Sequence, residues 1–145
     1  MYTITITTDD NFRKMVKKMG GLTKEMRDAA KRALIRSVTH VSSQVLGSGR
    51  VPYRRGDLRR SILPFYEGIN SPSGVMEGGV GTDKIYAPIH ELGLAVTRHS
   101  AWGRPTRPYV AQYKERAFLR IPFQQAQPVI ESIFTEEIEK ATRMK

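Results

Sequence analysis

A regular pattern of apolar and small residues between positions 24 and 47 constrains the fold of this chain more than any other feature. These residues recur every three or four positions, the spacing of one face of an α-helix: Met26, Ala30, Ala33, Leu34, Ser37, Val38, Val41 and Val45. Basic residues lie on the other face, at Lys24, Arg27, Lys31, Arg32 and Arg36. Thr23 is suited to cap the start of this helix, and Gly47 to end it. The pattern predicts a long helix that buries one face against another layer.

Three segments have the pattern of β-strands. Residues 2–7 (YTITIT) alternate apolar and β-branched residues at period two. Residues 62–66 and 75–81 read as two further strands, and the turn-rich sequence between them predicts an antiparallel hairpin. Because Pro64 cannot donate a hydrogen bond to a neighbouring strand, we expect it at a sheet edge or bulge.

Two more helices are predicted, one at each end of the chain. A short helix follows a cap at Asp9 or Asp10 and ends at Gly20-Gly21. A last helix is expected to begin at Pro128, because proline suits the first helical position. Its apolar side carries Ile130, Ile133, Phe134, Ile138 and Ala141.

The remaining sequence is rich in glycine, proline and arginine. We expect flexible loops near residues 47–57 and 94–109, with Asp57 capping a short helical turn after the first of them. Residues 1–145 suit one domain of the α+β class. In it, a small antiparallel sheet is packed by the long helix of the N-terminal half and by the C-terminal helix.

The net charge of +10 is unevenly distributed along the sequence. Residues 11–60 hold fourteen basic and three acidic side chains, whereas residues 61–97 hold one basic and four acidic ones. Residues 98–120 are basic again, with six basic side chains and one acidic. This asymmetry predicts a face that meets an anionic partner, either nucleic acid or an acidic protein surface. The alternative is a solvated helix surface with basic loops.

Most kinds of chemical site lack their sequence signature. The chain has no cysteine, its three histidines lack metal-ligand spacing, and no serine lies in a G-x-S-x-G motif. The glycine-rich segment VMEGGVGTDK lacks the G-x-x-x-x-G-K-[ST] pattern of a phosphate-binding loop. We therefore predict no catalytic nucleophile, no metal and no cofactor. One catalytic possibility stays open, namely acid–base catalysis by His90 with Glu91 and Tyr86, as in a small metal-independent ribonuclease.

The sequence also bears on where the protein is found. No apolar run approaches the roughly 20 residues that span a bilayer, so no membrane contact is expected. The segment MYTITITTDD has no basic region followed by an apolar stretch, so we expect no secretory leader. The absence of cysteine fits a reducing compartment. These features predict a soluble cytoplasmic product.

Three sequence blocks together resemble the tail-completion (head–tail joining, neck or minor tail) family of tailed bacteriophages. Residues 54–62 (RRGDLRRSI) are similar to its T-G-x-L-R-x-S-I block. Residues 80–93 (VGTDKIYAPIHELG) are similar to its V-G-T…Y-A-x-x-H-E-x-G block. Residues 116–134 (RAFLRIPFQQAQPVIESIF) are similar to its R-P-F-L-x-P-A block and the helix that follows.

This resemblance implies a non-enzymatic virion protein of the tail or neck that is assembled in the host cytoplasm. It implies a homo-oligomeric ring, which we expect to be a hexamer because the tube of a long-tailed phage is six-fold. The ring would complete the tail and join it to the head. Its expected partners are the tail-tube protein and the head-completion or connector proteins, with transient proximity to DNA in the ring lumen.

Within this framework, residues 86–93 form a structural turn. Tyr86, Ala87 and Pro88 leave a strand and enter one helical turn, which Ile89 and Leu92 anchor on the core. Gly93 supplies the positive φ that ends the turn. His90 and Glu91 are then satisfied locally or at a subunit contact. The side chains expected at a subunit or partner interface lie in the two loops and the turn between them: Arg54, Arg55, Arg59, Arg60, Arg98, Trp102, Arg104 and Arg107.

Two alternatives remain beside the ring subunit. The first is a basic nucleic-acid-binding module, in which Tyr53, Trp102 and Tyr109 stack on bases among the arginines. The second is the ribonuclease that uses His90.

Overall fold

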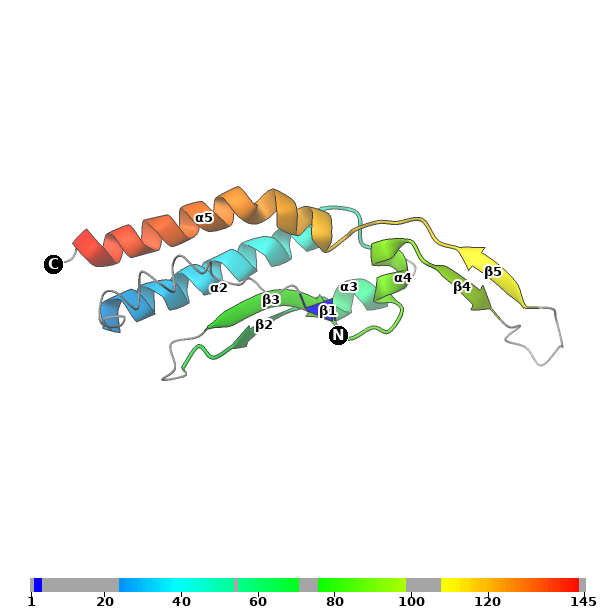
Figure 1. The fold of residues 1–145 in the computed structure, drawn as a ribbon, viewed down its shortest axis with the longest axis horizontal. Coiled ribbons are helices and arrows are strands. Elements are labelled where there is room, and N and C mark those ends of the chain that lie inside the picture. The colour runs from blue at the N-terminus through cyan, green and yellow to red at the C-terminus, as the bar shows by residue number, and fades with distance from the viewer. Residues whose placement is uncertain (1, 4–23, 54, 71–75, 99–107, 144–145) are drawn as a thin grey trace.

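A computed structural model of the chain describes residues 2–3, 24–53, 55–70, 76–98 and 108–143. The protein is elongated, with a helical body at one end and a two-stranded ribbon that projects from the other (Figure 1). The elements follow one another in the order β1 (Tyr2–Thr3), α2 (Lys24–Gly47), α3 (Asp57–Ser61), β2 (Leu63–Glu67), β3 (Glu77–Thr82), α4 (Ala87–Leu92), β4 (Ala95–Arg98), β5 (Tyr109–Gln112) and α5 (Arg120–Arg143).

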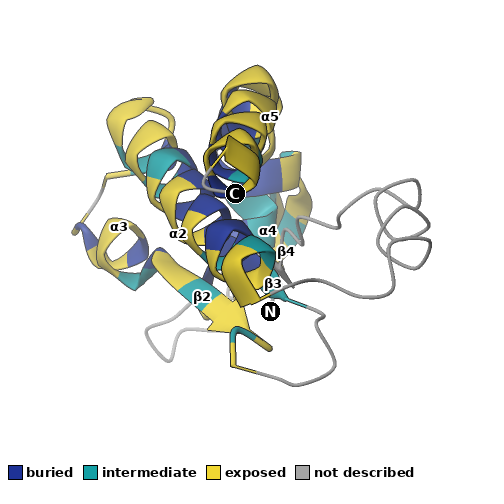
Figure 2. Ribbon diagram, turned by 90° about the vertical axis from the view of Figure 1, so that its left-hand side faces the viewer, coloured by how far each residue is buried: buried dark blue, intermediate teal, exposed yellow. Residues whose placement is uncertain are grey.

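The body has three layers. Helix α2 packs with one side on strands β2 and β3 and with another along α5, so it lies between the sheet and α5 (Figures 1 and 2). The fold is therefore α+β as predicted, with α2 packed on the small antiparallel sheet and α5 packed along α2.

The predicted long helix is confirmed as α2, Lys24–Gly47. Seven of the eight residues expected on its apolar face are buried, and Met26 is half-buried. Ala29, which the pattern left out, is fully buried as well. The buried stripe of α2 runs along the middle of the body in Figure 2 and continues into the core through Val80 and Phe118.

The predicted hairpin of β2 and β3 is also confirmed, because the two strands pair antiparallel from Leu63↔Gly81 to Glu67↔Glu77. The sheet order is β1-β3-β2, so Pro64 lies in an edge strand as expected. Gly78 of β3 faces α2, since an added Cβ would lie 2.9 Å from a methyl group of Val38. This glycine allows the helix and the sheet to approach closely.

The start of the C-terminal helix differs from the prediction. Helix α5 begins at Arg120, eight residues before Pro128, and Pro128 lies inside it. The backbone carbonyl that loses its donor belongs to Gln124, and both Gln124 and Pro128 are exposed, so water can replace the missing bond. Pro122 is tolerated for another reason, because an amide in the first helical turn has no intrahelical partner. Of the predicted apolar face, Ile130, Ile133 and Ala141 are buried.

The prediction of an irregular loop over residues 94–109 is wrong at both ends. Residues 95–98 form β4, which pairs antiparallel with β5 from Ala95↔Gln112 to Arg98↔Tyr109. The two strands make the projecting ribbon of Figure 1. Other predictions lie outside the described residues: the strand beyond Thr3, the short helix after Asp9 or Asp10, and the cap at Thr23.

Candidate functional site

The segment that follows β3 folds as the predicted turn. Helix α4 spans Ala87–Leu92 and has Pro88 in its first turn, and Gly93 ends it with a φ of 68°. The predicted anchors are wrong, however, because Leu92 is exposed and Ile89 is only half-buried. The buried side chains are Ala87 and Glu91. A short helix that buries a carboxylate must satisfy it with hydrogen bonds.

Glu91 obtains those hydrogen bonds from the start of α5. One carboxylate oxygen accepts the backbone N–H of Leu119, and the other accepts that of Arg120, each at 2.9 Å. Our expectation of a partner within the turn or on another subunit is therefore wrong for Glu91. Its partners lie 28 and 29 residues further along the same chain. The carboxylate acts as a helix cap that comes from another element, where it also meets the positive end of the helix dipole.

The connection from β5 to α5 is held against the same helix. The backbone N–H of Arg116 donates to the carbonyl of His90 at 2.8 Å, and that of Ala117 donates to the carbonyl of Glu91 at 3.2 Å. Ala117 adopts a φ of 44°, which is uncommon for a residue with a side chain. These contacts use the last carbonyl groups of α4, which have no partner inside a helix.

His90 lies between two tyrosine rings. Its ring centroid is 6.4 Å from that of Tyr86 and 5.4 Å from that of Tyr113, and both contacts are edge-to-face. Partial burial and the nearby Arg116 guanidinium hold the pKa of the His90 imidazole below its ordinary value. The imidazole is therefore mainly neutral at pH 7. Tyr113 was not among the predicted site residues, because the sequence pattern assigned residues 110–115 to no element or motif.

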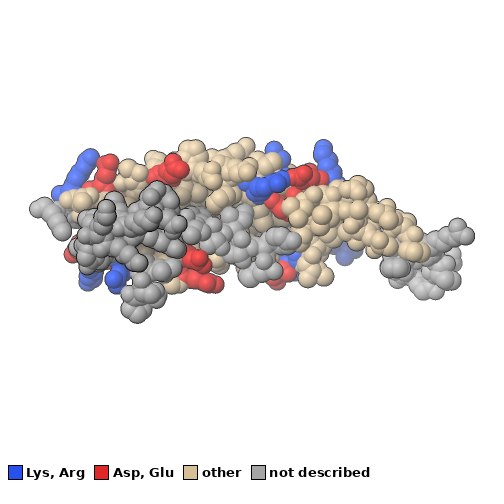
Figure 3. All heavy atoms as spheres, in the orientation of Figure 1, with Lys and Arg blue, Asp and Glu red and all other residues tan. Residues whose placement is uncertain are grey.

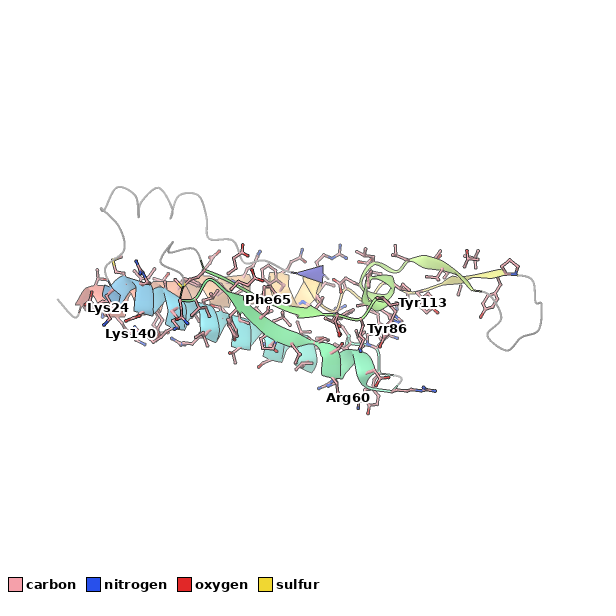
Figure 4. The ribbon with its side chains drawn as sticks, turned by 90° about the horizontal axis from the view of Figure 1, so that it is seen from below. Lys24, Arg60, Phe65, Tyr86, Tyr113 and Lys140 are labelled. Carbon is pink, nitrogen blue, oxygen red and sulfur yellow. The ribbon has the colours of Figure 1, made fainter. Side chains whose placement is uncertain are left out.

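A hollow of about 610 Å³ opens beside these rings. It is lined by one side of α4 and by the turn before α3, which brings Arg55 together with Tyr86 and His90. Arg55, a predicted interface residue, therefore lines the same hollow as Tyr86 and His90 of the predicted structural turn. In Figure 4, Tyr86, Tyr113 and Arg60 lie towards one end of the helical body, and Lys24 and Lys140 lie at the other.

The predicted interface arginines do not share one environment. Arg60 is bound within its own helix, where its guanidinium lies 2.6 Å from the carboxylate of Asp57. Arg55 and Arg59 are exposed and have no ion pair within the described residues. Arg98 is placed only by its backbone, in β4. The others, Arg54, Trp102, Arg104 and Arg107, lie outside the described residues.

A cluster of like charge at the opposite end of the sheet was not predicted. Glu67 and Glu77 are direct cross-strand partners at the far end of the β2–β3 ladder, so their side chains share one face. Within the described residues neither carboxylate has an ion pair. On the face that Figure 3 shows, Lys and Arg side chains lie among Asp and Glu side chains over the helical body. The sequence does not fix the register of the hairpin, so it could not predict that Glu67 and Glu77 lie opposite each other.

The described residues contain no cluster of three or more metal-ligating side chains and no helix that is long and apolar enough to cross a membrane. Comparison with protein-family models, curated proteins and solved structures finds no match to this chain. Function is therefore inferred from the residues and their arrangement.

Proposed function

We propose that this chain is a non-enzymatic structural protein of a tailed bacteriophage, which forms a ring at the head–tail junction, completes the tail and joins it to the head. The proposal starts from the resemblance of three separate sequence blocks to the tail-completion family. The observation in the structure that supports it most is how these three blocks are arranged.

The three blocks meet around one part of the core. Leu58 of the first block, Val80 of the second and Phe118 of the third are buried in the same apolar cluster. The hydroxyl groups of Ser61 and Thr82 lie 2.6 Å apart, which links the first block to the second. The Glu91 carboxylate links the second block to the third through the start of α5. Blocks that pack on one another in this way behave as one structural module.

The glycines of the blocks have structural roles as well. Gly93 has a positive φ, and a Cβ there would lie 2.6 Å from the backbone nitrogen of Glu115. Gly56 is buried with a φ of 74° and lies against the Tyr53 ring. Both positions require glycine for backbone geometry, not for the approach of a substrate. This supports reading the blocks as a scaffold.

The projecting ribbon favours a protein that assembles. A two-stranded ribbon is marginally stable in water unless something covers it. Strand β5 exposes two apolar side chains, with Tyr109 56% and Val110 67% accessible. Neighbouring subunits of a ring would cover such a surface. The further partners, a tail-tube protein and a head-completion or connector protein, are what the resemblance to the tail-completion family implies.

The arrangement around His90 gives little support to the ribonuclease alternative. Both oxygens of Glu91 are already bound to backbone amides, and the side chain is buried, so it is poorly placed to act as a base towards a substrate. The nucleic-acid alternative has one favourable observation, because Tyr53 is 77% accessible and is followed by two arginines in the sequence.

The test is to locate the protein in phage particles. Gold-labelled antibody against this chain is expected to mark the junction between head and tail. A lysate of phage that lacks the chain should contain separate heads and tails. In parallel, the purified protein is incubated with RNA and DNA. Label along the tail or on the capsid alone, or cleavage that disappears in His90→Ala, would overturn the proposal.

A further inference from the structure

Two acidic side chains face each other at one end of the sheet, and neither has an ion pair within the residues that the structure describes. Glu67 and Glu77 are paired across the β2–β3 ladder, and like charges directly opposite each other destabilise a sheet. They point away from α2, because the adjacent Gly78 faces it. This carboxylate pair therefore gains from a cationic partner outside the subunit.

The matching cations lie at the other end of the sheet. Arg55 and Arg59 come before β2 in the chain, are exposed and have no ion pair within the described residues, whereas Arg60 is bound to Asp57. Arg55 also lines the concave hollow beside Tyr86. Guanidinium groups suit this role because their planar donors match carboxylate oxygens.

The position of the two sites along β2 prevents them from meeting within one subunit. The arginines precede Leu63, at the start of the strand, and Glu67 ends it. The two ends of this strand are roughly 14 Å apart at about 3.4 Å per residue. Complementary sites at opposite ends of one element favour head-to-tail contact between copies, and such contacts form a ring when the rotation from one copy to the next closes.

We propose that the Glu67–Glu77 pair of one copy docks on the Arg55–Arg59 side of the next copy, and that this contact is the repeating interface of the assembly. The proposal rests on the proposed function insofar as that function requires a ring. A second copy of this chain explains both features with one contact. Nucleic acid would engage the arginines but would repel the carboxylates.

Charge reversal on each side tests the contact. The double variant Arg55→Glu/Arg59→Glu and the double variant Glu67→Lys/Glu77→Lys should each associate at least tenfold more weakly than the unmodified chain in sedimentation equilibrium at low salt. In an assembly made of either variant alone, side chains of like charge face each other at every contact. An equal mixture of the two restores attraction at every contact, so assembly should return with alternating copies.

Matched controls carry the same change in charge elsewhere on the surface. Lys24→Glu/Arg27→Glu and Asp28→Lys/Glu131→Lys alter exposed helix positions and should leave association unchanged. The interface is refuted if the reversals act no more strongly than these controls, if the mixture fails to associate, or if the unmodified chain stays monomeric at millimolar concentration. Tight RNA binding that is lost only in the arginine variant, with self-association unchanged, would refute it in favour of nucleic acid.

These outcomes are independent of the location of the protein in the particle. If the chain is found at the head–tail junction but the reversals have no effect, this interface fails and the proposed function stands. If the mixture is rescued but the chain is absent from particles, the proposed function fails and the interface stands.

Discussion

Replacing Glu91 with alanine should destabilise the protein strongly, because it removes the cap of α5. The carboxylate accepts two backbone N–H groups at 2.9 Å and is buried. Hydrogen bonds to an ionised acceptor contribute about 1.5 kcal/mol or more each, so the loss is about 3 kcal/mol. For a chain of this size, that corresponds to a fall in Tm of about 6–12 °C.

Two further variants sharpen this measurement. Glu91→Gln keeps one acceptor oxygen, so about half of the loss is expected, roughly 1.5 kcal/mol. Glu131→Ala removes an exposed carboxylate from the same α5 helix and should stay within about 0.5 kcal/mol of the unmodified protein.

The assay is urea unfolding followed by circular dichroism, with hydrogen exchange at the amides of Leu119 and Arg120. Both amides should lose protection in Glu91→Ala. The reasoning is refuted if Glu91→Ala and Glu131→Ala unfold at the same urea concentration, or if the two amides exchange at unchanged rates.

Three other substitutions are expected to change stability in defined directions. Gly93→Ala should cost about 2 kcal/mol more than Gly49→Ala in urea unfolding, because both have positive φ but only Gly93 faces a backbone within 3 Å; equal losses would contradict this. Ser37→Ala should raise the free energy of unfolding by about 1 kcal/mol, because its buried hydroxyl has no hydrogen-bond partner in the described part of the chain; a decrease would show that the hydroxyl is satisfied. The hydrogen bond from Arg32 holds the pKa of the Glu137 carboxyl below its usual value, so its stabilisation is present at neutral pH and is lost as the pH falls through that lowered pKa. The stability difference between the unmodified protein and Glu137→Gln, measured by thermal melts from pH 6 to pH 3, should therefore shrink in acid, and a constant difference would refute the role of this ion pair.

The sequence predicted those elements whose signal is local. Helix α2 was found because its apolar face repeats along one continuous segment, and the β2–β3 hairpin because a turn separates two short strands. Gly93 could be placed because a positive φ is needed where a helix ends. Each of these depends on neighbouring residues only.

The parts that were mispredicted depend on contacts between distant segments. The start of α5 has no local cap, because its cap is Glu91 from α4. The sequence pattern favours Pro128 as a helix start, because proline normally interrupts a helix. It is tolerated inside α5 because the position is exposed and water can bind the carbonyl that lacks a donor. Strands β4 and β5 are four residues each, and the segment between them is rich in arginine and proline.

The same limit applies to the candidate site. The sequence indicates the arginines near α3 by composition but does not show which of them are paired. The predicted cap at Asp57 is wrong, because Gly56 is the N-cap of α3 and Asp57 is the first helical residue, where it pairs with Arg60. The pairing of Glu67 with Glu77 depends on strand register, which one side-chain pattern does not fix. The hollow beside His90 requires the turn before α3 and the end of β5 to meet, and no short motif encodes that.

The most direct test of the ring assignment is to image isolated phage tails after adding the purified protein, with light scattering of the protein at two salt concentrations. We predict a six-fold ring at the upper end of the tail, and self-association that weakens as salt screens the exposed charges. A stable two-fold dimer that is indifferent to salt and absent from tails would contradict both the ring and its place at the head–tail junction.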